Sequence, residues 1–266
     1  MKKILTLFIL LIMTCFPAFS KEKVQMDDSA VGVYVFKINT KKYGEKIKPY
    51  MASSLMTTKK LYNSGKYDLV VNGGFFDVKT GESVSYVTID GDLKTEVKNN
   101  TRLCDDLKKQ DRLEKVLSRA ELRILEDKKG KLKFDINYHD EPIEDGYTLK
   151  HALQAGPMLY PSMDLVGEGF VSYENDMVKF QSVDILKRRE RTAIGLKGKD
   201  LYVVIFTKDY KVDANEMRDY MRKNLKLKKI LALDGGLSTS IDCKNVSIGS
   251  VGRYQRKVKS FLVIEK

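Results

Sequence analysis

The chain has 266 residues, of which 42% are hydrophobic and 32% are charged, and Lys and Arg (48) outnumber Asp and Glu (36). This composition supplies enough apolar residues for a hydrophobic core, which excludes a disordered tail. Three cysteines are too few for a disulfide-dense scaffold. The length allows one or two domains, and we expect one.

The first twenty residues have the pattern of a secretory signal peptide. Lys2-Lys3 form a basic start, residues 4–16 form an apolar run that is too short to span a membrane comfortably, and residues 17–20 resemble a cleavage site. We therefore expect export to the periplasm or the exterior, cleavage after about Ser20, and a mature protein of residues 21–266. Lipoprotein processing at Cys15 is the alternative, but Thr14 precedes that cysteine, where Gly, Ala or Ser is expected. No later stretch approaches ~18 consecutive apolar residues, so we expect no transmembrane helix.

Short apolar runs bounded by Gly, Asp, Asn and Lys predict a protein rich in strands. Two pairs of runs predict hairpins, with turns at 128–130 and 197–200. The expected strands are, in chain order, 31–38, 68–71, 86–89, 121–125, 131–138, 178–183, 192–196, 201–206, 230–233 and 261–264.

Two segments have the spacing of helices. Asp213 followed by Glu216 is typical of a capping box, and apolar residues then recur at helical spacing to about residue 225. Residues 102–119 carry a narrow apolar stripe and predict a second helix. The charge density and the turn signals of residues 99–145 indicate a possible linker or insertion. Together these elements predict an α+β single domain, with a large mixed or antiparallel sheet flanked by a few helices.

Cysteine and metal chemistry are both disfavoured. After cleavage of the leader, Cys104 and Cys243 remain, either as one disulfide or as two buried thiols. Only His139 and His151 could assist a cysteine nucleophile, and neither thiol lies in a catalytic motif. We assign no catalytic role to the histidines. No ligand spacing indicates a metal site, so we expect no obligatory metal and no other cofactor.

Four glycine-containing segments lie next to apolar strands, where the main chain can approach a ligand closely. Each also fits an ordinary turn or an edge strand. The strand over 230–233 gives the clearest functional signal, because it delivers Asp234 at its end and is followed by residues with N–H and O–H donors. The four segments are Asn72-Gly73-Gly74-Phe75-Phe76, Ala155-Gly156-Pro157, Arg191-Thr192-Ala193-Ile194-Gly195, and Asp234-Gly235-Gly236 with Ser238.

Taken in order, and together with Gly81-Glu82 and Glu216, these segments resemble the phosphodiester glycosidase family over residues 67–264. The resemblance implies an enzyme that hydrolyses a sugar-1-phosphodiester at the anomeric carbon, on a sugar-phosphate, glycan or cell-envelope type of substrate. Glu82 and Asp234 are the candidate catalytic carboxyls, because glycoside hydrolysis commonly uses two. The candidate substrate-binding residues are Asn72, Gly73, Gly74, Gly156, Arg191, Thr192, Gly235, Gly236 and Ser238.

These residues suit a charged sugar substrate. Arg191 and Thr192, with the main-chain N–H groups of Gly235 and Gly236, could contact a phosphate. Asn72 would hold a sugar hydroxyl or fix its own loop. We expect the strand ends that carry Asn72, Arg191 and Asp234 to converge.

The chain departs from the family pattern at three places. Leu237 replaces a third glycine, Ser85 replaces a glycine after Glu82, and residues 207–210 replace an Asp-Gly pair. A diverged protein that binds a glycan or an anionic polymer without catalysis is therefore the alternative function. The net charge of +12 permits nucleic-acid binding, but the lysines are scattered, so we expect a solvated basic surface and no nucleic-acid partner.

Overall fold

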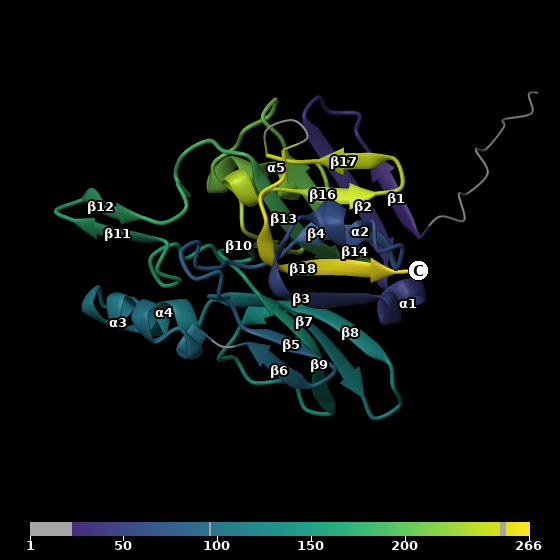
Figure 1. Cartoon of the computed structure of the whole chain (residues 1–266), viewed down its shortest axis with the longest axis horizontal. Helices are drawn as coiled ribbons and strands as arrows, with labels where there is room; N and C mark the ends of the chain where they lie inside the picture. Colours follow the sequence, from purple (N-terminus) through teal and green to yellow (C-terminus); the bar gives the residue numbers. More distant parts are fainter. Residues whose placement is uncertain (1–22, 96, 251–253) are drawn as a thin grey trace, which may run out of the picture.

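The computed structural model describes residues 23–95, 97–250 and 254–266. The expected signal peptide, residues 1–20, lies outside the described residues. In the described part of the chain the strands form four sheets, all their pairings are antiparallel, and short helices surround them (Figure 1). The α+β class with few helices is confirmed, although several sheets replace the one large sheet that we expected.

The central strands of sheet A are buried on both faces. Along β14, Leu201, Val203 and Ile205 enter the main core, whereas the alternating residues pack under α5 (Ala214–Lys223). Burial on both sides explains why residues 201–206 are an unbroken apolar run. In spatial order its strands are β1 (Val24–Asp27), β2 (Val33–Asn39), β14 (Asp200–Phe206), β13 (Arg191–Lys197), β15 (Lys229–Ala232) and β10 (Met158–Tyr160).

Sheet B carries the C-terminal strand between two early strands. β18 pairs with β4 on one side and with β3 on the other. Leu69 and Val71 face the core shared with sheet A, while Val70 faces the small helix α2 (Thr58–Tyr62). The order is β17 (Val246–Ile248), β16 (Ile241–Cys243), β4 (Tyr67–Asn72), β18 (Val258–Glu265) and β3 (Ile47–Met56).

Sheet C forms the lower layer of the molecule in Figure 1. Its strand β7 contributes Ala120, Leu122 and Ile124 to the main core. The segment 99–145, considered above as an insertion, therefore supplies part of the core that the sheets share. The order is β6 (Asp92–Thr95), β5 (Val87–Ile89), β9 (Tyr147–Gln154), β7 (Ala120–Asp127) and β8 (Leu132–Tyr138).

The fourth sheet is a two-stranded hairpin of β11 (Val171–Glu174) and β12 (Met177–Gln181). It extends from the body of the molecule on the same side as the helices α3 (Thr101–Lys109) and α4 (Leu113–Leu117) (Figure 1). All ten predicted strands coincide with observed strands to within three residues, and both predicted hairpins are present. Sequence patterns missed eight strands, namely β1, β3, β6, β9, β10, β11, β16 and β17.

The helix at Asp213 is confirmed. Asp213 caps α5 and Glu216 closes the capping box. The single helix expected over 102–119 is wrong: α3 (Thr101–Lys109) and α4 (Leu113–Leu117) are separated by a turn in which Asp111 has a φ of +52°, a conformation that interrupts a right-handed helix. The remaining helical elements are α1 (Thr40–Tyr43) and the 3₁₀ turns η1 (Gly44–Lys46), η2 (Val97–Asn99) and η3 (Gly236–Ser238). Cys104 is buried and Cys243 is half-buried, and the two do not form a disulfide with each other.

Candidate active site

The end of β4 is held by serine residues from two other segments. Gly73 N–H donates to the main-chain oxygen of Ser260 (2.9 Å) and Gly74 N–H to its hydroxyl (3.0 Å). Phe75 N–H donates to the Ser85 hydroxyl (2.9 Å). A Cβ on Gly74 would lie 2.3 Å from the main-chain oxygen of Gln154, so only glycine fits there. The glycines of the Asn72 segment therefore allow the main chain to approach its neighbours closely.

Asn72 joins three of the four predicted segments. Its side chain is fully buried, and its Nδ2 donates to the main-chain oxygen of Asp234 (2.7 Å). Its Oδ1 accepts from the Thr192 hydroxyl (2.8 Å) and from Ser240 N–H (3.1 Å). The predicted convergence of these strand ends is confirmed. Of the two roles considered for Asn72, these contacts correspond to fixing the loop.

The carboxyl group of Asp234 is almost entirely buried at this junction. β15 delivers it, and its own N–H donates to the main-chain oxygen of Gly73 (3.0 Å). Burial raises the pKa of Asp234 to about 6, although hydrogen bonds from Ser238 and Gly235 and the charges of Arg256 and Arg191 oppose that rise. A carboxyl with such a pKa can exchange a proton near neutral pH.

The main-chain N–H groups that we expected to contact a substrate already donate to other parts of the protein. Gly235 N–H donates to Asp234 Oδ1 (2.9 Å) and Gly236 N–H to the main-chain oxygen of Glu190 (2.8 Å). Gly156 N–H donates to the main-chain oxygen of Ala232 (3.1 Å). These glycines shape the site, and in this structure their N–H groups bind other parts of the protein.

Arg191 is also largely occupied by main-chain oxygens. Its Nε and Nη1 donate to Val212 and Val183, and its Nη2 donates to both Asp184 and Lys187, at 2.6 to 3.3 Å. Burial lowers the pKa of Arg191 to about 10. A Cβ added to Gly235 would lie 3.4 Å from Arg191 Nη1. The second N–H of Nη1 is therefore next to the Asp234 segment. Arg191 thus anchors residues 183–187, with little capacity left for a ligand.

Glu82 lies apart from this junction. It is exposed in a loop whose ends are joined by the bridge between Phe76 and Ser83. Its side chain lines a surface cavity of about 250 Å³, together with Lys94 and Lys259. The Glu82 carboxylate forms no hydrogen bond or ion pair with any residue that the structure describes.

Glu168 is a buried carboxyl that sequence patterns missed. Its oxygens accept from Met158 N–H (2.7 Å) and Ala120 N–H (3.1 Å), and burial raises the pKa of Glu168 to about 7. Gly156 has a φ of +96°, and a Cβ there would lie 2.5 Å from Glu168 Oε2. The glycine of the second predicted segment therefore makes room for this carboxyl. The sequence signal was a carboxylate between two glycines, Gly167-Glu168-Gly169.

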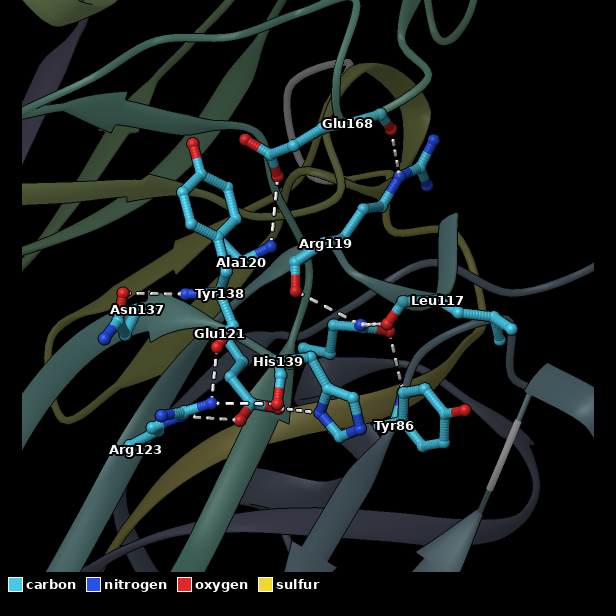
Figure 2. Close-up of polar contacts among 11 residues, drawn as sticks. Tyr86, Leu117, Arg119, Ala120, Glu121, Arg123, Asn137, Tyr138, His139 and Glu168 are labelled. Atoms are coloured by element: carbon cyan, nitrogen blue, oxygen red, sulfur yellow. Dashed lines mark hydrogen bonds and ion pairs between the residues drawn. The ribbon is translucent and has the colours of Figure 1, made fainter. Parts of the chain in front are cut away.

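Arg119 is a second residue that sequence patterns missed. Its guanidinium carbon lies 3.9 Å from the ring centre of Phe170 and 5.3 Å from that of Phe75, and Nε donates to the main-chain oxygen of Glu168 (2.9 Å). Figure 2 shows the Arg119 side chain and the Glu168 carboxylate pointing in opposite directions. Burial lowers the pKa of Arg119 to about 9. Its place in the expected helix concealed its position beside the Asn72 segment.

The two histidines make local contacts. His139 stacks on Tyr86 at 4.0 Å between ring centres, and its Nδ1 lies 2.8 Å from Glu121 Oε2 (Figure 2). Glu121 also accepts from Arg123 Nε (2.8 Å). His151 Nδ1 accepts from Asp90 N–H (3.1 Å).

A family model for phosphodiester glycosidases matches residues 65–265, which is more than half of the chain. The chain belongs to the phosphodiester glycosidase family. A comparison of its sequence with curated proteins gives no match.

Solved structures share the fold of this family member at low sequence identity. The catalytic domain of zebrafish N-acetylglucosamine-1-phosphodiester alpha-N-acetylglucosaminidase, auto-inhibited by its pro-peptide, matches with a TM-score of 0.62 and 15% identity over 91% of this chain and 81% of that one. A Burkholderia pseudomallei K96243 protein, described as a candidate exported protein, matches with a TM-score of 0.62 and 12% identity over 88% and 74%. A hypothetical protein from Synechocystis matches with a TM-score of 0.59 and 13% identity over 91% of this chain and 61% of that one. At these identities the likeness concerns the fold.

The structure shows the surroundings of Ser85 and Leu237, two of the residues that depart from the family pattern. Ser85 is buried and, as described, holds Phe75 N–H, so this serine supports the loop. Leu237 is 52% exposed in η3, where its side chain does not fill the buried junction.

Among residues 23–95, 97–250 and 254–266, no three His, Cys, Asp or Glu side chains are grouped so that they could hold a metal ion. No helix in that part of the chain is long and apolar enough to cross a membrane.

Proposed function

We propose that this member of the phosphodiester glycosidase family is an exported hydrolase that cleaves a sugar-1-phosphodiester at the anomeric carbon. The products would be the free sugar and a phosphomonoester. The observation that carries the proposal is the buried Asp234 carboxyl, at a junction that the Asn72 and Arg191 segments share.

In this proposal Asp234 acts as a carboxylate. With a pKa of about 6 it is mostly ionised at neutral pH, where it can accept a proton from water or stabilise positive charge at the anomeric carbon. A phosphate group leaves more readily than an alcohol, so the demand for acid catalysis is modest.

The second carboxyl has two candidates. Glu82 was chosen from its position in the family motif and stays a prediction. Glu168 is supported by its burial, its raised pKa of about 7 and its closeness to Gly156, and we assign it the role of the acid. About half of such a group is protonated at neutral pH, so it can donate a proton to the leaving oxygen.

We further propose that Asn72, Thr192, Arg191 and Ser238 position the substrate mainly through the loops that they fix. The glycines at 73, 74, 156, 235 and 236 would keep those loops close together. Their N–H groups, the Thr192 hydroxyl and most of the Arg191 donors already have protein partners, so these residues keep few groups for direct contact with a substrate.

The test is release of free sugar from UDP-N-acetylglucosamine and from a simple N-acetylglucosamine-1-phosphodiester by the protein of residues 21–266. Asp234→Asn is the control variant. Sugar release that this variant abolishes would support both the activity and the site. Release that Asp234→Asn leaves intact would contradict the role of Asp234.

A binding protein without catalysis is the second candidate. It is favoured by the net charge of +12 and by the internal use of the glycine N–H groups. Failure to cleave a panel of sugar-1-phosphodiesters, together with retained binding of an anionic glycan, would support it.

Export is part of the proposal and has its own test. Cleavage after about Ser20 would give a mature chain that starts at Lys21. The intact mass of the protein recovered from the periplasm or the medium would establish the cleavage site, and retention of residues 1–20 would contradict it.

A further inference from the structure

Arg119 is a buried cation whose hydrogen-bonding capacity is mostly unused. The residue is 5% exposed, and its Nε donates to the main-chain oxygen of Glu168. Its Nη1 and Nη2 atoms form no hydrogen bond with any residue that the structure describes. These two nitrogen atoms are accessible to solvent, so a ligand can reach their unused donors.

Arg119 forms no ion pair in the part of the chain that the structure describes, although the negative charge of Glu168 opposes the fall in the pKa of Arg119. The Glu168 carboxylate turns toward Ala120 N–H (Figure 2) and also accepts from Met158 N–H. A buried charge without a partner is unfavourable, so it is retained where a ligand supplies the opposite charge.

A second arginine lies on the same segment of chain. Arg112 Nη2 donates to the main-chain oxygen of Gly169 (2.8 Å), and its guanidinium carbon lies 3.8 Å from the ring centre of Phe180. Its Nε is buried without a hydrogen-bond partner. Its positive charge contributes to lowering the pKa of Arg119. Two cations that repel each other and keep unused donors favour an anion nearby.

The location of Arg119 ties it to the candidate active site. Phe75, on which the guanidinium lies, directly follows Gly74 of the Asn72 segment. Ala155 N–H donates to the main-chain oxygen of Ala120 (3.0 Å), which brings the neighbour of Arg119 next to Gly156. Glu168 links the segment of Arg119 to that of Gly156, because it accepts from Ala120 N–H and its carboxyl group lies close to Gly156.

We propose that Arg119, packed against Phe170 and near Phe75, binds the phosphate group of the substrate through Nη1 and Nη2, with Arg112 as the neighbouring second cation. This inference rests on the proposed function. The planar guanidinium matches two phosphate oxygens at once, and its position is fixed by the two rings and by Nε. When the bond from the anomeric carbon to the phosphate oxygen breaks, that oxygen gains negative charge, which the guanidinium stabilises.

A purely structural role for Arg119 predicts different behaviour. In that case the side chain would only anchor residues 168–170 to β7, and its replacement would affect stability without affecting anion binding. The two roles are therefore separated by a binding measurement on folded variants.

The experiment compares the wild type with Arg119→Met, Arg119→Lys and Arg222→Met. Arg222 is the matched control, because it also lies on an aromatic ring, with its guanidinium carbon 4.3 Å from the ring centre of Tyr160, but it is exposed. Binding of inorganic phosphate is measured by calorimetry or ³¹P NMR, and thermal unfolding verifies that each variant is folded. Turnover of a sugar-1-phosphodiester is measured in parallel.

We expect Arg119→Met to weaken phosphate binding by about tenfold or more, and to lower kcat/KM by roughly 10². Arg119→Lys keeps the charge but not the two-point contact, and it should fall between Arg119→Met and the wild type. Arg222→Met should match the wild type in both measurements. If Arg119→Met does not fold, Arg119→Lys still tests the inference.

The outcomes separate the inference from the proposed function. Phosphate binding that depends on Arg119 in a protein that cleaves no sugar-1-phosphodiester would support the inference and contradict the proposed activity. Turnover that persists in a folded Arg119→Met variant with unchanged phosphate affinity would overturn the inference and leave the activity standing. Absence of phosphate binding by the wild type would also overturn it.

Discussion

The side-chain nitrogen of Asn72 donates a 2.7 Å hydrogen bond to the main-chain oxygen of Asp234, 162 residues further along the chain. The same side chain accepts from Thr192 and Ser240. One amide group therefore connects β4, β13 and the segment after β15. The amide nitrogen donates and the amide oxygen accepts, so exchanging these two atoms would break the hydrogen bonds.

Replacement of Asn72 by Asp tests this connection. The new oxygen would face the main-chain oxygen of Asp234, and a buried charge would be added. We expect the free energy of unfolding to fall by about 3 kcal/mol. Thr192→Val, which removes one donor and leaves the amide in place, should cost about 1 kcal/mol. Urea unfolding of both variants would measure the difference, and equal stability of the two would contradict the importance of the amide donor.

The burial of Asp234 predicts a dependence of stability on pH. Its pKa is raised from 3.8 to about 6 in the folded state, so the folded protein holds this proton more tightly than the unfolded chain does. The resulting stabilisation is complete below about pH 4 and is lost as the pH rises through about 6. Relative to the wild type, Asp234→Asn should therefore gain on the order of 3 kcal/mol between pH 4 and pH 8. Urea unfolding at the two pH values tests this, and a relative loss for Asp234→Asn at pH 8 would show that the carboxylate is favourably paired.

The two raised pKa values also predict the pH dependence of activity. If Asp234 acts ionised and Glu168 acts protonated, kcat/KM is bell-shaped, with limbs near 6 and 7 and a maximum between them. Glu168→Gln should lower kcat by about 10² to 10⁴ and remove the alkaline limb. The matched variant is Glu82→Gln, whose side chain is exposed, so its stability should not change. Loss of turnover in Glu82→Gln with full turnover in Glu168→Gln would return the second catalytic role to Glu82.

Gly156→Ala tests the close approach to Glu168. Gly156 and Gly146 have similar backbone angles, with φ of +96° and +86°, but no atom lies within 4 Å of a Cβ on Gly146. Gly146→Ala should therefore lower the free energy of unfolding by about 1 kcal/mol, through backbone strain alone. Gly156→Ala should cost about 2 kcal/mol more, because its Cβ meets the Glu168 carboxyl. Equal losses in urea unfolding would mean that Glu168 moves aside freely.

Sequence patterns predicted the parts of the fold whose causes are local. The run 201–206 is apolar on both faces and could only be a buried strand, and the capping box at Asp213 marks the start of α5. The break between α3 and α4 was missed because a turn with Asp111 at positive φ leaves no strong signal in an otherwise helical stripe. The small strands β10 and β16 have three residues each, too few for a period to be recognised.

The site was predictable to the extent that glycines and strand ends mark it. Asn72, Thr192 and Asp234 do meet, as their places after apolar strands indicated. The occupied donors of Arg191 could not be foreseen, since they depend on main-chain oxygens in a loop without regular pattern. Arg119 and Glu168 are 49 residues apart, and burial of both is a property of the packed sheets that a single sequence does not display.

The position of β18 sets the order in which this site can form as the chain emerges. Gly73 and Gly74 are held by Ser260, which lies in the last strand, between β3 and β4. A chain that emerges from its N-terminus can pair β13 with β14 earlier, but the loop after β4 has no support on that side until residue 260 has emerged. The loops of the candidate site are thus fixed late, so a shorter chain would carry the motifs without the contacts that hold them in place.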